Sequence, residues 1–342
     1  MYSAFFGFSK EPFNVTPDPE FLYLSPDHRE ALASLIYAVD QGKGFVVIIG
    51  EVGVGKTTVI RTYLDLVDRR VLLPVYLFNS NLSFNYLLKT ILRELDCKNI
   101  SDETNEMVNQ LHIRLIQEYS QGRIIVLIID EAQNMPVETL ENIRLLSNLE
   151  STKGKLIQIV FSAQPEFETV LERHELRQLR QRIAVKATIR LLSVKESIRY
   201  IKHRLSKVMA DSSAPFSPHA LRLIAREAKG APRLINIYCD NCLLTSYGLR
   251  KKKVTGSVVR DVSANFAGSH QTGKGWWLLL AVMVGVVLCA YGMAFTLDTR
   301  GEENLTLWER GWRRIHGVSA SVGGANVGSV SVSGQSAALV GK

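Results

Sequence analysis

The chain has 342 residues, of which 46% are hydrophobic and 22% charged, so it can bury a large core, and its composition excludes an intrinsically disordered protein. Four cysteines in a chain of this length do not form the disulfide framework of a small secreted domain. The net charge of +8 is concentrated in residues 193–275, where 15 basic residues against 5 acidic ones give +10.

The chain begins without a secretory signal and continues as an alternation of strands and helices. Residues 1–14 lack a basic stretch followed by a long apolar run, so we expect the first domain to stay where it is made. Short apolar runs predict buried strands at residues 45–49, 72–79, 124–129 and 156–161. Helical sequence separates these runs. The alternation predicts an α/β domain with a parallel sheet over residues 1–192.

A phosphate-binding loop is predicted between the first strand and the helix expected at residues 56–67. The sequence there is Gly50-Glu51-Val52-Gly53-Val54-Gly55-Lys56-Thr57, followed by Thr58, and it matches the spacing GxxxxGK[ST]. Glycines let backbone N–H groups surround phosphates, and the start of the helix adds partial positive charge. We expect Lys56 to contact the β- and γ-phosphates of ATP and Thr57 to bind Mg²⁺.

Two carboxylates follow the strand predicted at residues 124–129. The carboxyl end of such a strand lies beside the phosphate-binding loop, so we expect Asp130 to hold the hydration shell of Mg²⁺. Glu131 is then positioned to orient and activate the water that attacks the γ-phosphate. An acidic pair after a strand is often only surface, but the upstream loop favours the catalytic interpretation.

The pattern changes after residue 192, where helical periodicity predicts a small lid domain over residues 193–266. We expect its helices at residues 194–209, 218–228, 233–247 and 255–266. Its basic charge would attract nucleic-acid phosphates or anionic lipids, although most basic faces on helices are only solvated surface. We interpret Cys239 and Cys242, which lie inside a helical pattern, as core thiols rather than as a redox or zinc site.

The remaining sequence predicts a membrane tether. Residues 267–275 form a Gly/Ser-rich linker, and residues 276–297 contain no charged residue over a length that can cross the hydrocarbon core. Flanking charges alone do not favour a cytoplasmic first domain. The need of the first domain for ATP does favour a cytoplasmic position. We therefore expect a single-pass protein of the bacterial inner membrane with a cytoplasmic ATPase domain. Residues 298–342 form a low-complexity tail, expected in the periplasm without a stable fold.

Several motifs together resemble the ExeA-type ATPases of the bacterial general secretion pathway, known as protein A. The motifs are Phe5-Phe6-Gly7-Phe8, Pro12-Phe13, Thr16-Pro17-Asp18-Pro19, Phe21-Leu22-Tyr23-Leu24-Ser25, His28-Arg29-Glu30-Ala31, Gly50-Glu51-Val52-Gly53 and Asp130-Glu131-Ala132-Gln133. The resemblance covers residues 1–266 and extends to relatives in pilus assembly and exopolysaccharide export. It implies a P-loop NTPase of the AAA+ kind with a helical lid, assembled as a homo-oligomer. The secretion type often continues into a peptidoglycan-binding module, and the short tail departs from that pattern.

The resemblance also implies sensor residues that spacing alone does not assign. The segment Ser162-Ala163-Gln164-Pro165-Glu166 is similar to the family's GQPE segment, so Gln164 corresponds to a polar sensor near the γ-phosphate. A helix-starting turn is the alternative. Arg233, which follows Gly230-Ala231-Pro232, corresponds to a second sensor that links the nucleotide to the lid. Asn79 is a candidate for holding Glu131 inactive until a partner binds.

An arginine finger is implied by the likeness of residues 179–183 to the family segment that carries one. Such an arginine is offered to the nucleotide of a neighbouring subunit, where it neutralises charge in the transition state. Arg177, Arg180 and Arg182 are all candidates for this role. Ordinary surface arginines are an equal alternative.

The expected function is that of a membrane-anchored AAA+ ATPase that drives or licenses assembly of a secretion or envelope-export apparatus. Its expected partners are further copies of itself and components of that apparatus. One alternative is a nucleic-acid-associated ATPase resembling transposition regulators, which would use the basic lid on phosphates. Another is a nucleotide-dependent scaffold with negligible turnover. The predicted membrane helix favours the first, and we expect no specific nucleic-acid binding.

Overall fold

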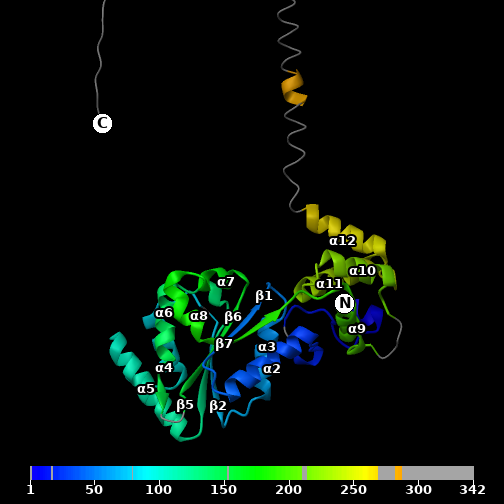
Figure 1. Cartoon of the computed structure of the whole chain (residues 1–342). Coiled ribbons are helices and arrows are strands. Elements are labelled where there is room, and N and C mark those ends of the chain that lie inside the picture. Colours follow the sequence, from blue (N-terminus) through cyan, green and yellow to red (C-terminus); the bar gives the residue numbers. More distant parts are fainter. Residues whose placement is uncertain are drawn as a thin grey trace, which may run out of the picture. The chain divides into compact units, whose positions relative to one another are not determined.

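The computed structural model describes residues 2–16, 18–78, 80–151, 154–209, 214–268 and 282–286. The chain divides into two units, Met1–Ser269 and His270–Lys342. All helices and strands named below belong to the first unit (Figure 1).

A five-stranded parallel sheet forms the centre of this unit. Its strands lie in the order β2 (Leu72–Leu77), β3 (Ile124–Ile129), β6 (Ile157–Ala163), β1 (Phe45–Gly50) and β7 (Ile183–Ile189). Every residue of β1 and β6 is buried, which is why β1 is a continuous apolar run and β6 is apolar apart from Gln158 and Ser162. The sheet confirms the predicted α/β class, and four of its strands lie where the sequence predicts them.

The fifth strand, β7, was missed. Sequence patterning placed no strand between residues 161 and 192, whereas the structure pairs β7 with β1 along its whole length. As an edge strand it alternates exposed positions with buried or half-buried ones, and it carries the exposed Lys186. It therefore lacks the continuous apolar run by which a strand buried on both faces is recognised.

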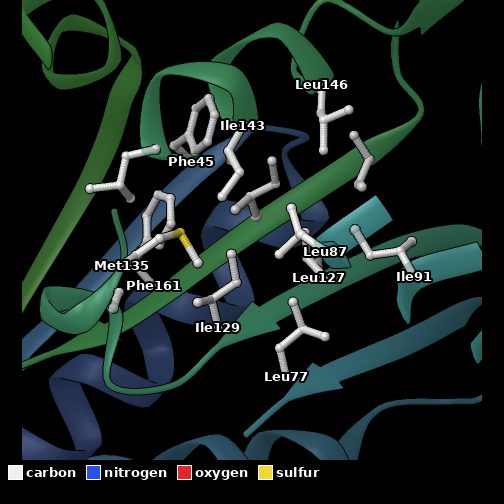
Figure 2. Packing of buried hydrophobic residues seen from close by; sticks show 14 of the residues in the cluster. Phe45, Leu77, Leu87, Ile91, Leu127, Ile129, Met135, Ile143, Leu146 and Phe161 are labelled. Atoms are coloured by element: carbon white, nitrogen blue, oxygen red, sulfur yellow. The ribbon is translucent and has the colours of Figure 1, made fainter. Parts of the chain in front are cut away.

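Helices cover both faces of the sheet (Figure 1). Alternate residues of β1 face opposite cores: Phe45, Val47 and Ile49 pack on one side, and Val46 and Ile48 on the other. The first core includes α4 (Phe84–Glu94), α5 (Thr104–Ser120), α6 (Val137–Leu146), α7 (Glu166–Leu171) and α8 (Arg177–Arg182); Figure 2 shows its centre. The second includes α2 (Pro26–Asp40) and α3 (Lys56–Leu66).

Several short elements connect these layers. They are the 3-10 turns η1 (Pro19–Phe21), η2 (Ala132–Asn134) and η3 (His174–Leu176), and a small antiparallel pair formed by β4 (Glu150–Ser151) and β5 (Gly154–Lys155). Of these, η2 matters for the site, because it follows β3 directly and turns the chain at the carboxyl end of the sheet.

The lid consists of α9 (Val194–Ser206), α10 (Pro218–Glu227), α11 (Pro232–Gly248) and α12 (Gly256–Gly268). Its four helices match the predicted ones to within a few residues at each end. The N-terminal segment also belongs to this core. It begins with α1 (Tyr2–Phe6), and its buried aromatic side chains pack among the lid helices rather than against the sheet: Tyr2, Phe8, Phe13 and Phe21.

The predicted membrane helix falls almost entirely outside the described residues. Within residues 276–297 the structure describes residues 282–286, which are helical with exposed side chains. No helix in the described part of the chain is long and apolar enough to span a bilayer. Most of the predicted linker, the whole tail at residues 298–342, and Asn79 also lie outside the described residues. The spanning segment and the domain boundaries therefore stay predictions.

Candidate nucleotide site

The phosphate-binding loop joins β1 to α3 and is shaped by two glycines in the left-handed region. Gly53 has φ +74° and Gly55 has φ +107°, and residues with a Cβ rarely adopt such values. A Cβ on Gly55 would lie 2.7 Å from His28 Nε2, and a Cβ on Gly53 would lie 2.7 Å from the Cβ of Arg233. Both backbone angle and packing therefore require glycine here.

Lys56 opens α3 and directs its ammonium group back into the loop. Its Nζ donates to the carbonyl oxygens of Gly50 at 2.7 Å and Glu51 at 3.1 Å, and the residue is only 5% exposed. Burial lowers the pKa of Lys56, while the carboxylates of Glu131, Asp130 and Glu51 act in the opposite direction. No side chain caps the start of α3, so its first N–H groups are available to an anion.

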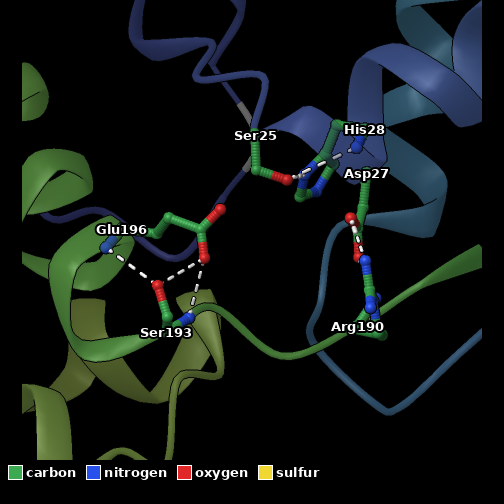
Figure 3. A network of polar contacts seen from close by, with 6 residues as sticks. All are labelled: Ser25, Asp27, His28, Arg190, Ser193 and Glu196. Atoms are coloured by element: carbon green, nitrogen blue, oxygen red, sulfur yellow. Dashed lines mark hydrogen bonds and ion pairs between the residues drawn. The ribbon is translucent and has the colours of Figure 1, made fainter.

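His28 supports the loop from the first turn of α2 (Figure 3). Its Nε2–H donates to the carbonyl oxygen of Val54 at 2.8 Å, and its Nδ1 accepts from Ser25 Oγ at 2.6 Å. Burial lowers the pKa of His28, which favours the neutral ring, in which Nδ1 accepts from Ser25 Oγ. In the sequence His28 is only part of a resemblance motif, and its spacing gave no signal of this role.

The connection from the sheet to the lid is held beside His28 (Figure 3). Arg190, directly after β7, donates through Nε and Nη2 to the two carboxylate oxygens of Asp27, each at 2.9 Å. Ser193 and Glu196 form a capping box that starts α9. The short connection between β7 and α9 is thereby fixed at both ends.

Asp130 lies at the carboxyl end of β3 among three hydroxyl donors. Its Oδ2 accepts from Tyr76 at 2.7 Å and from Thr57 Oγ1 at 3.1 Å, and its Oδ1 accepts from Ser162 Oγ at 2.7 Å. The structure thus brings together Thr57 and Asp130, which are 73 positions apart in the sequence. Sequence reasoning gave no role to Tyr76 or Ser162.

The oxygen donors of Thr57 and Asp130 are of the kind that Mg²⁺ prefers. Among the described residues no cluster of three or more His, Cys, Asp or Glu side chains could hold a metal ion by itself. The pair therefore fits an ion that takes its other ligands from phosphate oxygens and water, as Mg²⁺ does in nucleotide sites.

Glu131 is held in a left-handed backbone conformation, with φ +53° and ψ +41°, which is uncommon for a residue with a side chain. Its carboxylate Oε2 accepts from Gln133 Nε2 and from Gln164 Nε2, each at 2.7 Å. Ser80 Oγ donates to the carbonyl oxygen of Glu131 at 2.6 Å. The structure thus brings the predicted Glu131 and Gln164 together and adds Gln133, to which the sequence assigned no role.

The lid reaches the phosphate-binding loop at the start of α11. The Arg233 backbone N–H donates to the carbonyl oxygen of Gly53 at 3.3 Å, and the Arg233 residue is exposed. Close packing also fixes Gly230, where an added Cβ would lie 2.0 Å from the carbonyl oxygen of Leu192. Arg233 therefore lies beside the loop, and its role as a sensor stays a prediction.

The three arginines considered as a finger all lie in α8 but differ in their surroundings. Arg182 donates to the side chains of Ser147 and Asn148, so its guanidinium is engaged within its own chain. Arg177 and Arg180 are exposed. Among the described residues, their side chains form no hydrogen bond and no ion pair. The structure does not bring these arginines to the loop residues of the same chain.

A pocket of about 540 Å³ adjoins the phosphate-binding loop. Val54, Gly55 and Thr58 line it from the loop and α3. The N-terminal segment and the lid supply other parts of the wall, including Leu22, Tyr23, Leu192, Tyr200 and Pro232. Its size, its many apolar and aromatic residues and its charged residues, Asp18, Arg61, Asp65, Arg69 and Arg204, are typical of a small-molecule site. Glu51 and Val52, on the loop itself, are exposed.

Comparison with known proteins defines the class of this fold and site. Residues 39–171 match a protein-family model described as an AAA domain. This match includes the phosphate-binding loop, Asp130, Glu131 and Gln164. The chain is thus an α/β P-loop protein that contains an AAA domain.

One relative is "General secretion pathway protein A" of Aeromonas hydrophila. The two sequences are 35% identical over 293 residues, which is 85% of this chain and 53% of that protein. The likeness confirms the resemblance to the secretion-pathway protein A family. This chain spans about half the length of the curated relative that it matches.

Solved structures show the same fold at lower identity. The Aeropyrum pernix ORC2 protein in ADPNP–ADP complexes has a TM-score of 0.58 at 19% identity, covering 75% of this chain and 72% of that one. Cdc6p from Pyrobaculum aerophilum has a TM-score of 0.54 at 16% identity, covering 70% and 68%. At these identities the likeness concerns the fold alone.

Proposed function

We propose that the chain is an ATP-hydrolysing AAA+ subunit that is anchored to the bacterial inner membrane and drives or licenses assembly of a secretion or envelope-export apparatus. One observation carries the enzymatic part. Asp130 and Glu131 lie at the carboxyl end of β3, with Asp130 bonded to Thr57 of the phosphate-binding loop and Glu131 to Gln164. Because the two carboxylates have different partners, Asp130 is suited to metal binding and Glu131 to water activation.

Each residue of the site has a distinct task in this proposal. Lys56 and the N–H groups at the start of α3 hold the phosphates. Thr57 and Asp130 hold Mg²⁺, which when bound neutralises negative charge on the phosphates. Glu131 orients the attacking water and accepts its proton, and Gln164 lies close enough to Glu131 to contact the γ-phosphate side of the site.

The pocket of about 540 Å³ beside Thr58 suits the nucleoside part of ATP. Because the N-terminal segment and the lid both line it, bound nucleotide would join these two parts to the loop. Arg233, whose backbone already contacts Gly53, would then act as a second sensor that reports the nucleotide to the lid.

The cellular role rests on the secretion-pathway relative and on the apolar segment at residues 276–297. A chain built this way would act as a homo-oligomer on components of an export complex. The likeness to the ORC2 and Cdc6p structures is one of fold only and gives no argument for nucleic-acid binding.

Two substitutions test the enzymatic proposal. Lys56→Ala should abolish nucleotide binding, because it removes the charge that holds the phosphates. Glu131→Gln should retain binding and lose turnover by roughly a hundredfold or more, because it removes only the group that activates water. Binding of a fluorescent ATP analogue and release of phosphate by the full-length protein measure the two effects. Normal hydrolysis by Glu131→Gln would show that the base is another residue.

A further inference from the structure

A second cavity, a groove of about 880 Å³, lies on the lid and shares no residue with the nucleotide pocket. We call it the lid groove. Two parts of the chain from opposite ends of the first unit line it: the N-terminal segment around Phe5 and Phe6, and the lid from Ile198 to Lys253. It therefore depends on the packing of the N-terminus against the lid and does not belong to the site for ATP.

The N-terminal motif Phe5-Phe6-Gly7-Phe8, which the nucleotide site does not use, forms one wall of this groove. Phe5 and Phe6 are only half-buried and meet edge to face at 5.0 Å. Behind them, Phe6 stacks on the buried Phe8 at 5.6 Å, and Phe5 packs against Tyr247 at 5.4 Å. The two rings are thus held firmly while part of each remains available to a ligand.

The groove is apolar at its base and positively charged around it. Ile198, Phe216 and Leu221 are among its apolar residues, and the last two are buried. Its charged residues are all basic: Lys202, Arg222, Lys252 and Lys253. None of the four forms an ion pair with a described residue. Cations without an acidic partner among the described residues, placed around an apolar base, are complementary to a ligand that is both anionic and apolar.

We propose that the lid groove binds an acidic peptide segment of a partner protein, with apolar side chains against Phe6 and Leu221 and carboxylates against Arg222 and Lys253. An exposed groove of this kind suits an extended or helical segment whose apolar residues anchor it and whose charges fix its orientation. The inference concerns a docking surface and does not rest on ATP hydrolysis.

A peptide fits this groove better than a nucleic acid does. Single-stranded nucleic acid binds by stacking bases on open aromatic faces. Here Lys252 Nζ lies over the Phe5 ring, 4.3 Å from its centroid, and Phe8 covers a face of Phe6. The rings therefore offer edges and partial faces, which suit aliphatic and aromatic side chains.

A peptide also fits better than a membrane surface. Lys252 and Lys253 precede the first residue of α12, whereas the predicted membrane segment follows its last residue. At a rise of ~1.5 Å per residue, the length of α12 separates its first residue from its last by about 20 Å. The basic residues Lys252 and Lys253 thus lie at the opposite end of α12 from Gly268, after which the chain continues toward the predicted tether.

The test measures peptide binding by fluorescence anisotropy with the full-length protein in detergent micelles. The probe is a fluorescein-labelled peptide of about 12 residues, long enough in extended form to cross the groove, composed of Glu, Asp, Leu and Phe. A second peptide replaces Leu and Phe by Ser at the same charge. We expect saturable binding of the first peptide and at least ~10-fold weaker binding of the second, because apolar contacts add to the charge attraction.

Charge reversal in the groove supplies the matched comparison. The double variant Arg222→Glu/Lys253→Glu should weaken binding of the first peptide by roughly tenfold or more, because attraction becomes repulsion. The control variant Arg226→Glu/Lys251→Glu makes the same change of net charge on the same helix and loop, outside the groove lining. It should change the affinity for the first peptide by less than ~2-fold. Thermal unfolding of both variants and their nucleotide binding should match the wild type, which separates lost docking from lost folding.

Several results would overturn the proposal. They are equal affinity for the two peptides, equal loss in the two double variants, or no saturable peptide binding. A groove-specific loss of binding to phosphatidylglycerol vesicles or to single-stranded DNA, without a loss of peptide binding, would assign the groove to lipid or nucleic acid instead. All arms run without nucleotide and also with Lys56→Ala protein, so failure of the ATPase proposal leaves this result unaffected.

Discussion

Gln133 joins the two residues that the proposed hydrolysis depends on most. Its side-chain amide donates to the Glu131 carboxylate at 2.7 Å, and its Oε1 accepts the backbone N–H of Gln164 at 3.0 Å. Gln164 in turn donates to the same carboxylate oxygen of Glu131. The three residues form a closed ring of hydrogen bonds, so the position of the carboxylate depends on a residue that need not touch the nucleotide.

We expect Gln133→Ala to lower kcat while leaving ATP-analogue binding near wild type. A hydrogen bond to a charged group contributes about 1.5–3 kcal/mol, which corresponds to a loss of roughly 10- to 150-fold if it orients Glu131 in the transition state. Phosphate release under saturating ATP measures the change. Asn134→Ala, at an exposed position in the same turn, is the control.

A double variant separates positioning from general damage. If Gln133 acts through Gln164 and Glu131, Gln133→Ala and Gln164→Ala together should cost less than the sum of their separate effects. Additive losses, or a loss of nucleotide binding in Gln133→Ala alone, would place its importance in the fold instead.

At the scale of elements, α8 presents two kinds of arginine. The guanidinium of Arg182 is tied to Ser147 and Asn148 at the end of α6, and this contact joins α8 to α6. Arg180, two positions earlier, is exposed on the same short helix. The structure therefore favours Arg180 over Arg182 as the group offered to a neighbouring subunit.

Mixing two inactive full-length proteins tests this assignment. Lys56→Ala protein retains Arg180, and Arg180→Ala protein retains an intact phosphate-binding loop, so a mixed oligomer contains sites that combine both. We expect the mixture to recover measurable ATP hydrolysis, up to roughly a quarter of wild type if subunits mix randomly in equal amounts and both parts are required. A mixture of Lys56→Ala and Glu131→Gln proteins should recover no hydrolysis, because one subunit must supply both Lys56 and Glu131 to its own nucleotide site. Absence of recovery with Arg180→Ala would exclude Arg180 as the finger.

Elements also show where sequence patterning succeeds and where it stops. The central strands and the loop from Gly50 to Thr57 were predictable because their signals are local: continuous apolar runs and a fixed spacing of glycines. The edge strand β7 was missed because one of its faces is exposed. His28 and Gln133 were missed as site residues because their partners lie in other segments, and no local pattern indicates a contact with Val54 or Gln164.

At the scale of the whole molecule, the tether prediction concerns residues 276–297. The full-length chain made in bacteria should sediment with membranes and resist extraction by about 1 M salt, which shortens the screening length to ~3 Å but leaves apolar burial intact. A chain ended after Gly268 should appear in the soluble fraction. Fractionation followed by immunoblotting measures both. Recovery of the full-length chain in the salt wash would contradict a spanning helix.

The packing of the N-terminus into the lid has a consequence for how the protein is made. The side chains of Tyr2 and Asp240 are hydrogen-bonded, although 238 positions separate them, and Phe13 meets Phe216 edge to face. A ribosome adds ~5–20 residues per second, so Tyr2 emerges roughly 10–50 s before its partner exists. Throughout that interval the aromatic N-terminus lacks the lid residues that bury it, and the sheet is completed only once β7 has been made. The first residues synthesised are thus among the last to be buried, which makes them a natural target for chaperones at the ribosome.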